Sequence, residues 1–468
     1  MGIFGALSTA ISGLEAQSTA LANISNNIAN SQTTAFKRTE TSFEEIVAST
    51  SVNQQGSGVV RANSQATNTV AGDILPSDVD THIAVNGDGY FIIAEQTGTV
   101  DGDPIFGGVD LYTRVGDFEV DRSGFLVNSS GYFLKGIAVD AVTGNLSGTL
   151  PEVIQISNEL LPAQATTTIE YRANLATTPK TATFDPTIAN SELIGTVGDY
   201  PSGNLPTVAG TGFVAQQDEN AFLAHSVAGG AITSFASNGA SVNVQVRWSK
   251  IDSISNGGVD TWNAFYQTDA TATGTGSANA IWRNFGTNYT FDASGTLQTP
   301  TANSVVINNL TVSGTNLGTV TVDHRSPNGS KGLSQFEDAN GIVQVTIIDQ
   351  NGFAAGELSS VSITDAGRVT GIYTNGESVD LAEITLAAFN ADGALRKEDG
   401  GALRATPNSG AAILGAQGSI VGSSLESSNT DIADEFSKLI ITQQAYAAGT
   451  RIVTTADEML QEALNMVR

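Results

Sequence analysis

Apolar residues recur every three or four positions at both ends of the chain. From Phe4 to Ile28, six of the eight positions in this repeat are apolar, and from Ile432 to Val467 eight of eleven are apolar. Such spacing lines up apolar side chains along one narrow stripe of a helix, as in coiled coils. The pattern therefore predicts two coiled-coil helices that pair with each other, over residues 1–35 and 425–468.

Between these helices the pattern changes to short apolar runs that alternate with turns. It is clearest in residues 82–93, 112–140 and 341–389. Residues 187–320 differ, because only 11 of the 134 are charged and loop-like runs are frequent. We predict a mostly β protein with α-helical termini and nested β domains between them. The expected parts are a connecting segment at 36–80, a β domain in two pieces at 81–186 and 321–424, and an inserted outer β domain at 187–320.

The balance of charges limits the partners that the chain can have. It carries 47 acidic and 20 basic residues, a net charge of -27, and no cysteine. Nucleic-acid binding needs clustered Lys and Arg to neutralise phosphates, so we expect no nucleic-acid partner. No run approaches the ~20 apolar residues of a membrane span, so no membrane insertion is expected. No Lys or Arg precedes Lys37, which argues against a cleaved secretory signal peptide.

No catalytic or metal-binding motif emerges from the sequence. The three histidines, His82, His225 and His324, lie in separate segments without recurring spacing to carboxylates. The stretch DQNGFAAGE at 349–357 fails as a calcium loop, because its glycine and glutamate are not at the sixth and twelfth positions. We therefore expect no enzyme activity, no catalytic residue, no metal and no cofactor.

Two long motifs at opposite ends of the chain carry a family resemblance. The first is ALSTAISGLEAQSTALANISNNIANSQTTAFK at 6–37, and the second is GSSLESSNTDIADEFSKLIITQQAYAAGTRIVTTADEMLQEAL at 422–464. In this order they resemble the bacterial flagellar rod and hook axial protein family. The large insertion at 187–320 is similar to its hook members, since the rod members are shorter. Ala35 stands where the family usually has glycine; if this position needs a positive φ, alanine costs about 1 kcal/mol there.

The resemblance implies a structural subunit of the flagellar hook, a curved, flexible helical tube that couples the rod to the filament and transmits torque. The implied partners are further copies of this chain in a helical homopolymer, the flagellar distal rod protein, the hook cap protein, the hook-filament junction protein and the flagellar export apparatus. The implied location is extracellular, in the hook, reached through the flagellar channel without a cleaved signal peptide. The paired terminal helices are expected at the inner wall of the tube.

Assembly residues are expected on the apolar stripes and in the two family motifs. The strands predicted between the helices leave few helices inside one copy, so the stripes should bury against other copies; an ordinary helix pair within one chain is the alternative. The expected assembly residues are Leu7, Ile11, Leu14, Leu21, Asn26, Asn27, Ile28, Asn30, Phe36, Leu425, Glu426, Asn429, Asp431, Ile432, Phe436, Leu439, Tyr446, Val453, Leu460 and Leu464.

Two other functions stay open on sequence grounds. A flagellar distal rod or hook-associated axial protein would share both terminal motifs. An extracellular adhesin would bind glycans through its central β domain, although the sequence offers no catalytic pair that favours glycan chemistry.

Overall fold

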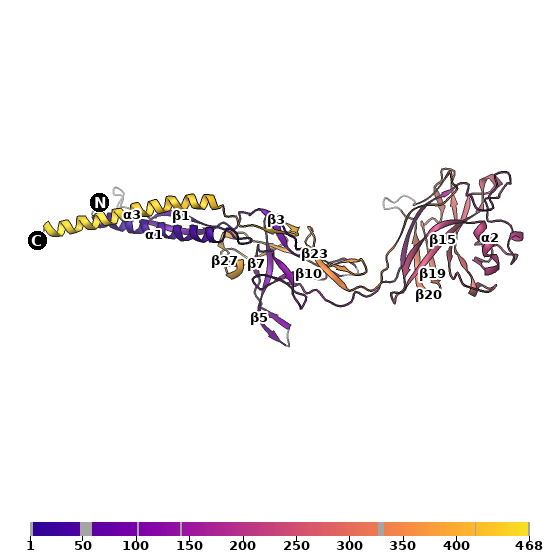
Figure 1. The fold of residues 1–468 in the computed structure, drawn as a ribbon, viewed down its shortest axis with the longest axis horizontal. Helices are drawn as coiled ribbons and strands as arrows, with labels where there is room; N and C mark the ends of the chain where they lie inside the picture. Colours follow the sequence, from indigo (N-terminus) through magenta and orange to yellow (C-terminus); the bar gives the residue numbers. More distant parts are fainter. Residues whose placement is uncertain are drawn as a thin grey trace. The chain divides into compact units, whose positions relative to one another are not determined.

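The computed structural model describes residues 3–46, 59–100, 103–140, 143–325, 332–416 and 418–466. Strands dominate, and a helix lies at each end of the chain, α1 (Ile3–Ala29) and α3 (Ile432–Met466) (Figure 1). The two helices pair with each other. The predicted fold class, mostly β with paired α-helical termini, is thereby confirmed.

The chain folds into two compact units. The first unit comprises residues 1–158, 358–373 and 378–468, and the second comprises residues 159–357 and 374–377.

Strand β12 (Thr168–Ala176) explains why the second unit begins where it does. It pairs in parallel with β20 (Thr315–Asp323) and antiparallel with β22 (Gln344–Gln350). These pairings place residues 159–186 and 321–357 in the second unit, whereas the sequence analysis assigned them to the surrounding β domain.

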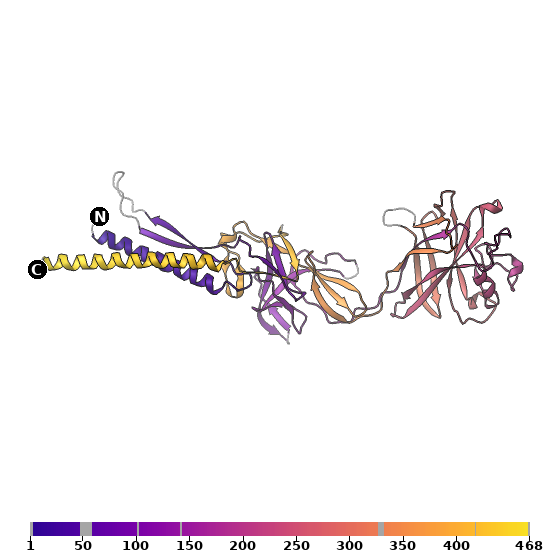
Figure 2. The same ribbon diagram turned by 45° about the horizontal axis from the view of Figure 1, so that its top comes forward.

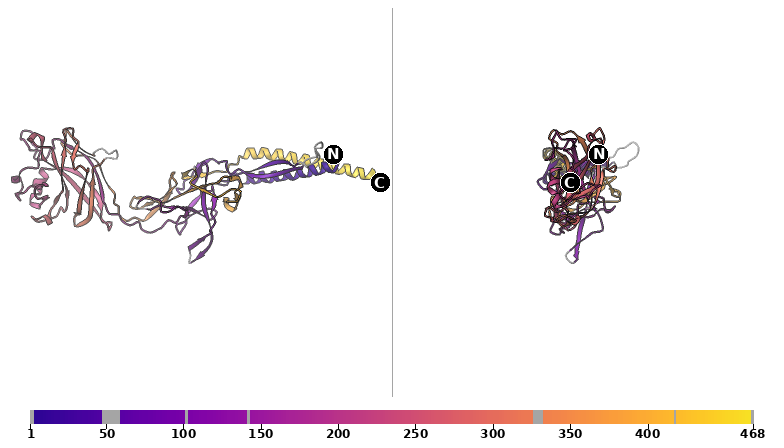
Figure 3. Two further views of the ribbon diagram at one scale, coloured as in Figure 1. Left: turned by 180° about the vertical axis from the view of Figure 1, so that it is seen from behind. Right: turned by 90° about the vertical axis from the view of Figure 1, so that its right-hand side faces the viewer.

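In the first unit, α1 and α3 run antiparallel. Asn27 near the end of α1 contacts Glu435 in the first turn of α3. Further along the pair, a Cβ at Gly449 would lie 2.9 Å from Leu14 Cδ2, so the glycine permits the two helices to approach closely. Both ends of the chain therefore lie at the same end of the helix pair (Figures 2 and 3).

A two-stranded ribbon packs along α1. It consists of β1 (Thr39–Ile46) and β2 (Val59–Ala66), which pair antiparallel. The Asn23 side chain of α1 donates to Thr41 Oγ1 at 2.7 Å and to Ser64 Oγ at 2.8 Å, one residue from each strand. The ribbon thus covers part of the surface of α1 that α3 leaves free.

The first unit also contains a large sheet with the central order β23-β24-β25-β10-β5-β7-β28-β27. Phe91, Phe118, Leu134 and Val369 are fully buried in its core, and the rings of Phe91 and Phe118 meet edge to face with centroids 6.0 Å apart. The remaining strands of this unit are β3 (Ile74–Pro76), β4 (Ile83–Asn86), β5 (Tyr90–Val100), β6 (Asp103–Phe106), β7 (Leu111–Thr113), β8 (Phe118–Val120), β9 (Leu126–Asn128), β10 (Tyr132–Ala138), β11 (Glu152–Val153), β23 (Leu358–Ile363), β24 (Arg368–Tyr373), β25 (Ser378–Glu383), β26 (Leu386–Ala388), β27 (Arg396–Lys397), β28 (Ala402–Arg404), β29 (Ile413–Leu414), β30 (Ser419–Gly422) and β31 (Ser424–Glu426).

Several tight turns share one hydrogen-bond pattern. An Asp or Asn Oδ1 accepts the backbone N–H groups two and four residues later, and the glycine three residues later has a positive φ. In these turns the Asp or Asn side chain therefore satisfies backbone N–H groups of the turn. The turns begin at Asp121, Asn128, Asp292 and Asp338.

The second unit consists of two sheets, in the orders β13-β17-β16-β15-β14 and β19-β20-β12-β21. One apolar core joins them, with Trp248 and Trp262 from the first sheet and Tyr171 and Val320 from the second. The other elements are β13 (Phe213–Val214), α2 (Glu219–Ala224), β14 (Val227–Phe235), β15 (Ser241–Asp252), β16 (Thr261–Gln267), β17 (Trp282–Phe291), β18 (Leu297–Thr299), β19 (Ser304–Val312) and β21 (Leu333–Phe336).

His324 connects the two sheets of the second unit and is fully buried. Its Nδ1 lies 2.9 Å from the Tyr171 carbonyl oxygen, and its Nε2 lies 3.1 Å from the Tyr289 hydroxyl. Because a carbonyl only accepts, Nδ1 carries the proton and the Tyr289 hydroxyl donates to Nε2. Burial lowers the pKa of His324 to about 4, so the neutral imidazole is part of the core.

We expect the second unit to lose stability as the pH falls from 6.5 to 4. Unfolded histidine takes up a proton near pH 6.5, but folded His324 does so only near pH 4, so within this window the unfolded state binds more protons. The difference corresponds to about 3 kcal/mol. Urea unfolding can be followed by tryptophan fluorescence, because Trp248, Trp262 and Trp282, the chain's three tryptophans, all lie in this unit.

The control for this experiment is His324→Gln, which keeps a donor and an acceptor but does not titrate. The variant should lose less stability than the parent between pH 6.5 and 4. Equal losses in the two proteins would contradict the role of His324.

Candidate functional site

The two terminal motifs meet where α1 ends and α3 begins. Strand β31, just before α3, pairs with β3, which places Leu425 opposite Leu75. Around this pairing, five polar side chains form a cluster that we call the polar joint. The polar joint consists of Asn27, Lys37, Arg114, Glu426 and Asn429.

Asn27 ties three elements together. Its Oδ1 accepts the Thr39 N–H at 2.9 Å, and its Nδ2 donates to the Thr39 carbonyl oxygen at 3.0 Å, which fixes the start of β1. The same Nδ2 donates to Glu435 Oε2 at 3.0 Å, in the first turn of α3. Asn27 and Glu435 are only 2% and 1% exposed, so little solvent can replace these bonds.

Asn429 makes the matching connection from the C-terminal motif. Its Oδ1 accepts the Arg38 N–H at 2.8 Å. Its Nδ2 donates to Thr67 Oγ1 at 3.1 Å and to the Val70 carbonyl oxygen at 3.0 Å. Its own N–H donates to the Phe36 carbonyl oxygen at 3.2 Å. Asn429 therefore holds both the segment just before β1 and the segment just after β2.

Glu426 supplies the one carboxylate of the polar joint, and its side chain is fully buried. Lys37 Nζ donates to Glu426 Oε1, the Gly72 N–H donates to the same oxygen at 2.8 Å, and Arg114 Nη1 lies 3.6 Å from Oε2. Burial lowers the pKa of Lys37, while the hydrogen bond and charge of Glu426 oppose that shift. Two buried cations thus share a single carboxylate, and removing it would leave Lys37 without a countercharge and Arg114 with only the more distant Asp392 nearby.

The asparagines of the first motif lie where α1 stops. Asn30 Nδ2 donates to the Asn26 carbonyl oxygen at 3.0 Å, which satisfies a backbone acceptor of the last turn. Thr33 Oγ1 donates in turn to Asn30 Oδ1 at 3.2 Å. At the other helix, Asp431 Oδ1 accepts the Ala433 N–H at 2.8 Å and so caps the start of α3.

Ala35 adopts the left-handed backbone conformation, with φ at 54°. It is buried, and its N–H donates to the Glu426 carbonyl oxygen at 2.8 Å. The hydrogen bond fixes the backbone in a region that glycine enters freely and alanine does not.

On α3, the positions nearest α1 form a stripe of mostly small or polar residues. The less exposed positions are Glu435, Leu439, Thr442, Gly449, Thr450, Val453, Ala456 and Leu460. The predicted stripe meets this one at Leu439, Val453 and Leu460, and at the partly exposed Tyr446. Ile432 and Phe436 of the predicted stripe are 43% and 49% exposed, so they lie outside the stripe that faces α1. Leu464 lies in the last described turns of α3.

On α1, the most buried positions are not those of the predicted stripe. Ala16, Ala20, Ile24 and Asn27 are buried. Of the other predicted residues of α1, Leu7, Leu14, Leu21 and Ile28 are half-buried, whereas Asn26 is exposed and Ile11 is 51% exposed.

A second apolar stripe on α3 is not covered by any described residue of the chain. We call it the outer stripe. Ile441 is 67% exposed, Ile452 and Met459 are each 54% exposed, and Met466 is 77% exposed. The outer stripe consists of Ile441, Ala445, Ala448, Ile452, Met459 and Met466, all of them exposed and spaced by three, four or seven residues. Exposed apolar surface of this extent is typical of an interaction site.

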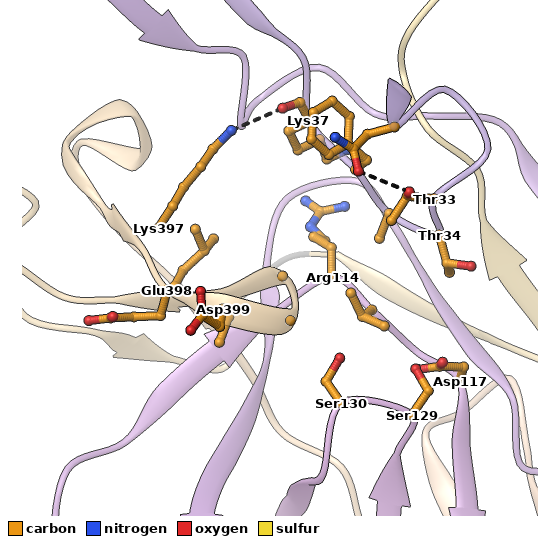
Figure 4. A pocket seen from close by; sticks show the side chains of 18 of the residues that line it. Thr33, Thr34, Lys37, Arg114, Asp117, Ser129, Ser130, Lys397, Glu398 and Asp399 are labelled. Atoms are coloured by element: carbon orange, nitrogen blue, oxygen red, sulfur yellow. Dashed lines mark hydrogen bonds between the residues drawn. The ribbon is translucent and has the colours of Figure 1, made fainter. Parts of the chain in front are cut away.

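A cavity of about 720 Å³ lies beside the polar joint (Figure 4). Lys37 and Arg114 of the joint line it, together with Tyr90, Lys397 and the turn at Ser130. Lys397 Nζ donates to the Lys37 carbonyl oxygen at 3.0 Å. Burial lowers the pKa of Lys397 and raises that of Tyr90.

Sequence reasoning placed Asn27, Glu426 and Asn429 in the candidate site but missed Arg114 and Tyr90. Tyr90 begins β5 and Arg114 directly follows β7, so both reach this region because β5 and β7 pair beside it. No local motif marks them, so only the three-dimensional pairing could identify them.

Three family models match the chain. "Flagella basal body rod protein" matches residues 7–37, "Flagellar hook protein FlgE/F/G D1 domain" matches 84–170, and "Flagellar basal body rod FlgEFG protein C-terminal" matches 421–466. Every residue of the polar joint falls within one of these matches.

Curated relatives match over the full length. The "Flagellar hook protein FlgE" of Escherichia coli (strain K12) is 29% identical over 98% of this chain and 100% of its own. That of Brucella suis biovar 1 is 26% identical over 100% of both chains. Among solved structures, Helicobacter pylori flagellar hook protein FlgE2 is 15% identical, with a TM-score of 0.49 over 75% of this chain and 100% of that chain.

We expect Glu426→Gln to destabilise the first unit by about 3 to 5 kcal/mol, because the buried Lys37 would lose its countercharge and the buried Arg114 would lose its ion-pair partner. Calorimetry of the full chain would show the loss in the first unit, while tryptophan fluorescence would show the second unit unchanged. The matched control is Glu40→Gln, which breaks the solvent-accessible pair with Arg38 and should cost less than about 1 kcal/mol. Equal effects of the two substitutions would argue against the polar joint as a stabilising element.

We expect Ala35→Gly to stabilise the first unit by about 0.5 to 1 kcal/mol, since the relief of a left-handed alanine exceeds the entropy that glycine adds to the unfolded chain. The same substitution at the buried strand residue Ala84, where φ is not positive, should destabilise it. Calorimetry would compare the two. A loss of stability in Ala35→Gly would show that this turn is not strained.

Proposed function

Since this chain belongs to the flagellar hook protein family, we propose that its terminal helices pack against those of other copies and so build the hook as a helical tube. The chain is a structural subunit of the bacterial flagellar hook and not an enzyme. It acts in motility through self-assembly into the hook polymer.

The observation that carries the proposal is the outer stripe of α3. Burying one large aliphatic side chain contributes roughly 1.5 to 3 kcal/mol, and the outer stripe offers Ile441, Ile452, Met459 and Met466, each at least 54% exposed. Within the described chain, α1 occupies a different stripe of α3. A helix of a second copy can therefore bury the outer stripe without disturbing the intramolecular pair.

Such a contact joins two different surfaces. The outer stripe of one copy would meet another part of the helix pair in the next copy, which makes the contact heterologous. Heterologous contacts that do not close into a ring generate helical polymers. We place α1 and α3 at the inner wall of the tube, as the polymer's continuous layer.

The contacts of the finished hook follow from its position between rod and filament. We propose that this chain contacts the distal rod protein at the lower end of the hook and the hook-filament junction protein at its upper end. During growth of the hook it would contact the hook cap protein. We also propose export through the flagellar channel without a cleaved signal peptide. The absence of cysteine supports this route, because no disulfide would hold the chain folded. Among the described helices, none is long and apolar enough to span a bilayer.

We expect Ile441→Asp and Ile452→Asp each to abolish polymer formation at concentrations where the parent chain polymerises. Each places a charge on the outer stripe but makes no change on the α1 side, so the monomer should keep its melting behaviour. Sedimentation and negative-stain electron microscopy would measure the polymer. Gln444→Asp, at an exposed position of α3 outside the stripe, is the matched control, and normal tubes from the two isoleucine variants would refute the proposal.

A further inference from the structure

The cavity beside the polar joint has the features of a binding site that its own chain does not fill. Segments from distant parts of the sequence line it: residues 33–37 after α1, residues 114–117 after β7, the turn at 129–130, and residues 397–403. Figure 4 shows Arg114 between these segments, with its guanidinium directed toward Lys37 and away from Ser129 and Ser130.

Two buried donors in the cavity wall lack acceptors. Tyr90 and Arg114 are only 2% and 6% exposed, and the Tyr90 hydroxyl and Arg114 Nε make no hydrogen bond within the described part of the chain. A buried donor without an acceptor costs about 1 to 3 kcal/mol. Both groups would be satisfied by oxygen atoms of a bound molecule.

The cavity also offers acceptors. Asn68 Oδ1 and Asp117 Oδ1 are buried and equally unpaired within the described chain, and both residues line the cavity. A wall that presents donors and acceptors together suits a polypeptide, which carries C=O and N–H groups side by side, better than it suits a simple anion.

Charge in the cavity is separated rather than uniform. Lys37 and Arg114 share one carboxylate, Glu426, and Lys397 binds a backbone oxygen and lies 5.5 Å from the centre of the Phe36 ring. The lining carries three cations, Lys37, Arg114 and Lys397, and three anions, Asp117, Glu398 and Asp399. Of the acidic lining residues, Glu398 is already paired with two arginines, and Asp117 and Asp399 remain on the other side.

The chain's net charge indicates what enters the cavity. At -27, copies of this chain repel one another, and close assembly needs cationic sites that meet acidic groups. We propose that this cavity receives an acidic segment of a second copy, whose carboxylate binds Arg114, Tyr90 and Lys397 while its backbone pairs with Asn68 and Asp117. The inference rests on the proposed function, because a second copy reaches the cavity only within a polymer.

The test is a photo-crosslinker, p-benzoylphenylalanine, placed at Ser130 of the full chain. Ser130 is exposed at the cavity rim. The matched control places the same residue at Ser123, which is also exposed and holds the third position of the same type of turn, begun by Asp121, but does not line the cavity. Irradiated polymer from the Ser130 variant should give crosslinks between copies at about tenfold the control yield, and mass spectrometry should locate them in a segment containing Asp or Glu.

A second measurement uses charge. Lys397→Glu should raise the concentration needed for polymerisation about tenfold, as expected for the loss of one partly buried charge contact. Lys397→Arg keeps the positive charge and should polymerise at the concentration of the parent chain. Lys180→Glu is the control, because Lys180 also donates to a backbone carbonyl, that of Ala339, but lies outside the cavity.

The outcomes separate the two proposals. Polymer that forms normally but shows no crosslinks between copies at Ser130, or crosslinks only to segments without acidic residues, overturns this inference and leaves the proposed function intact. Failure of the parent chain to polymerise under any condition would overturn both.

Discussion

A single buried carboxylate, Glu426, holds the two ends of this chain to its β sheet. Lys37 reaches it from the N-terminal motif and Arg114 reaches it from the sheet, so three segments far apart in the sequence share one ion cluster. Buried ion pairs add little net stability when complete but are costly to break. The cluster therefore acts chiefly as a geometric constraint. It fixes the point at which the helix pair meets the sheet, because Lys37, Arg114 and Glu426 must lie together there. Asn27 and Asn429 add side-chain hydrogen bonds that fix the direction of each chain segment at that point.

The two stripes of α3 serve different contacts: one faces α1 within the chain, and we propose that the other packs against neighbouring copies. The stripe that faces α1 is built largely from small and polar residues such as Thr442, Gly449 and Ala456, because two helices in close contact leave little room for larger side chains. Leu439, Val453 and Leu460 also lie on that stripe, whereas Ile441, Ile452, Met459 and Met466 lie exposed on the outer stripe. A 3.5-residue repeat in the sequence reveals that α3 has apolar faces, but it does not say which of them is used within the monomer. This is why the helices could be predicted, whereas the register of their contact could not.

The limits of prediction elsewhere have the same physical origin. Turns could be predicted because local chemistry determines them. In the Asp-x-x-Gly turns, the aspartate accepts hydrogen bonds from the turn backbone and the glycine adopts a positive φ. The boundary of the second unit depends on β12 finding partners more than 130 residues away, which no local pattern encodes. Arg114 likewise joins the polar joint through strand pairing alone. Ala35 is an intermediate case, since the family pattern pointed to a left-handed position and the structure places alanine there.

The antiparallel helix pair also governs how this protein can be labelled or displayed. Both ends of the chain emerge at the same free end of α1 and α3, so a fluorescent protein or affinity tag fused to either terminus would occupy one confined region next to the helices of neighbouring copies. The turn begun by Asp292 in the second unit exposes Asp292, Ala293 and Ser294. A short insertion there would carry a reporter without adding to either terminus.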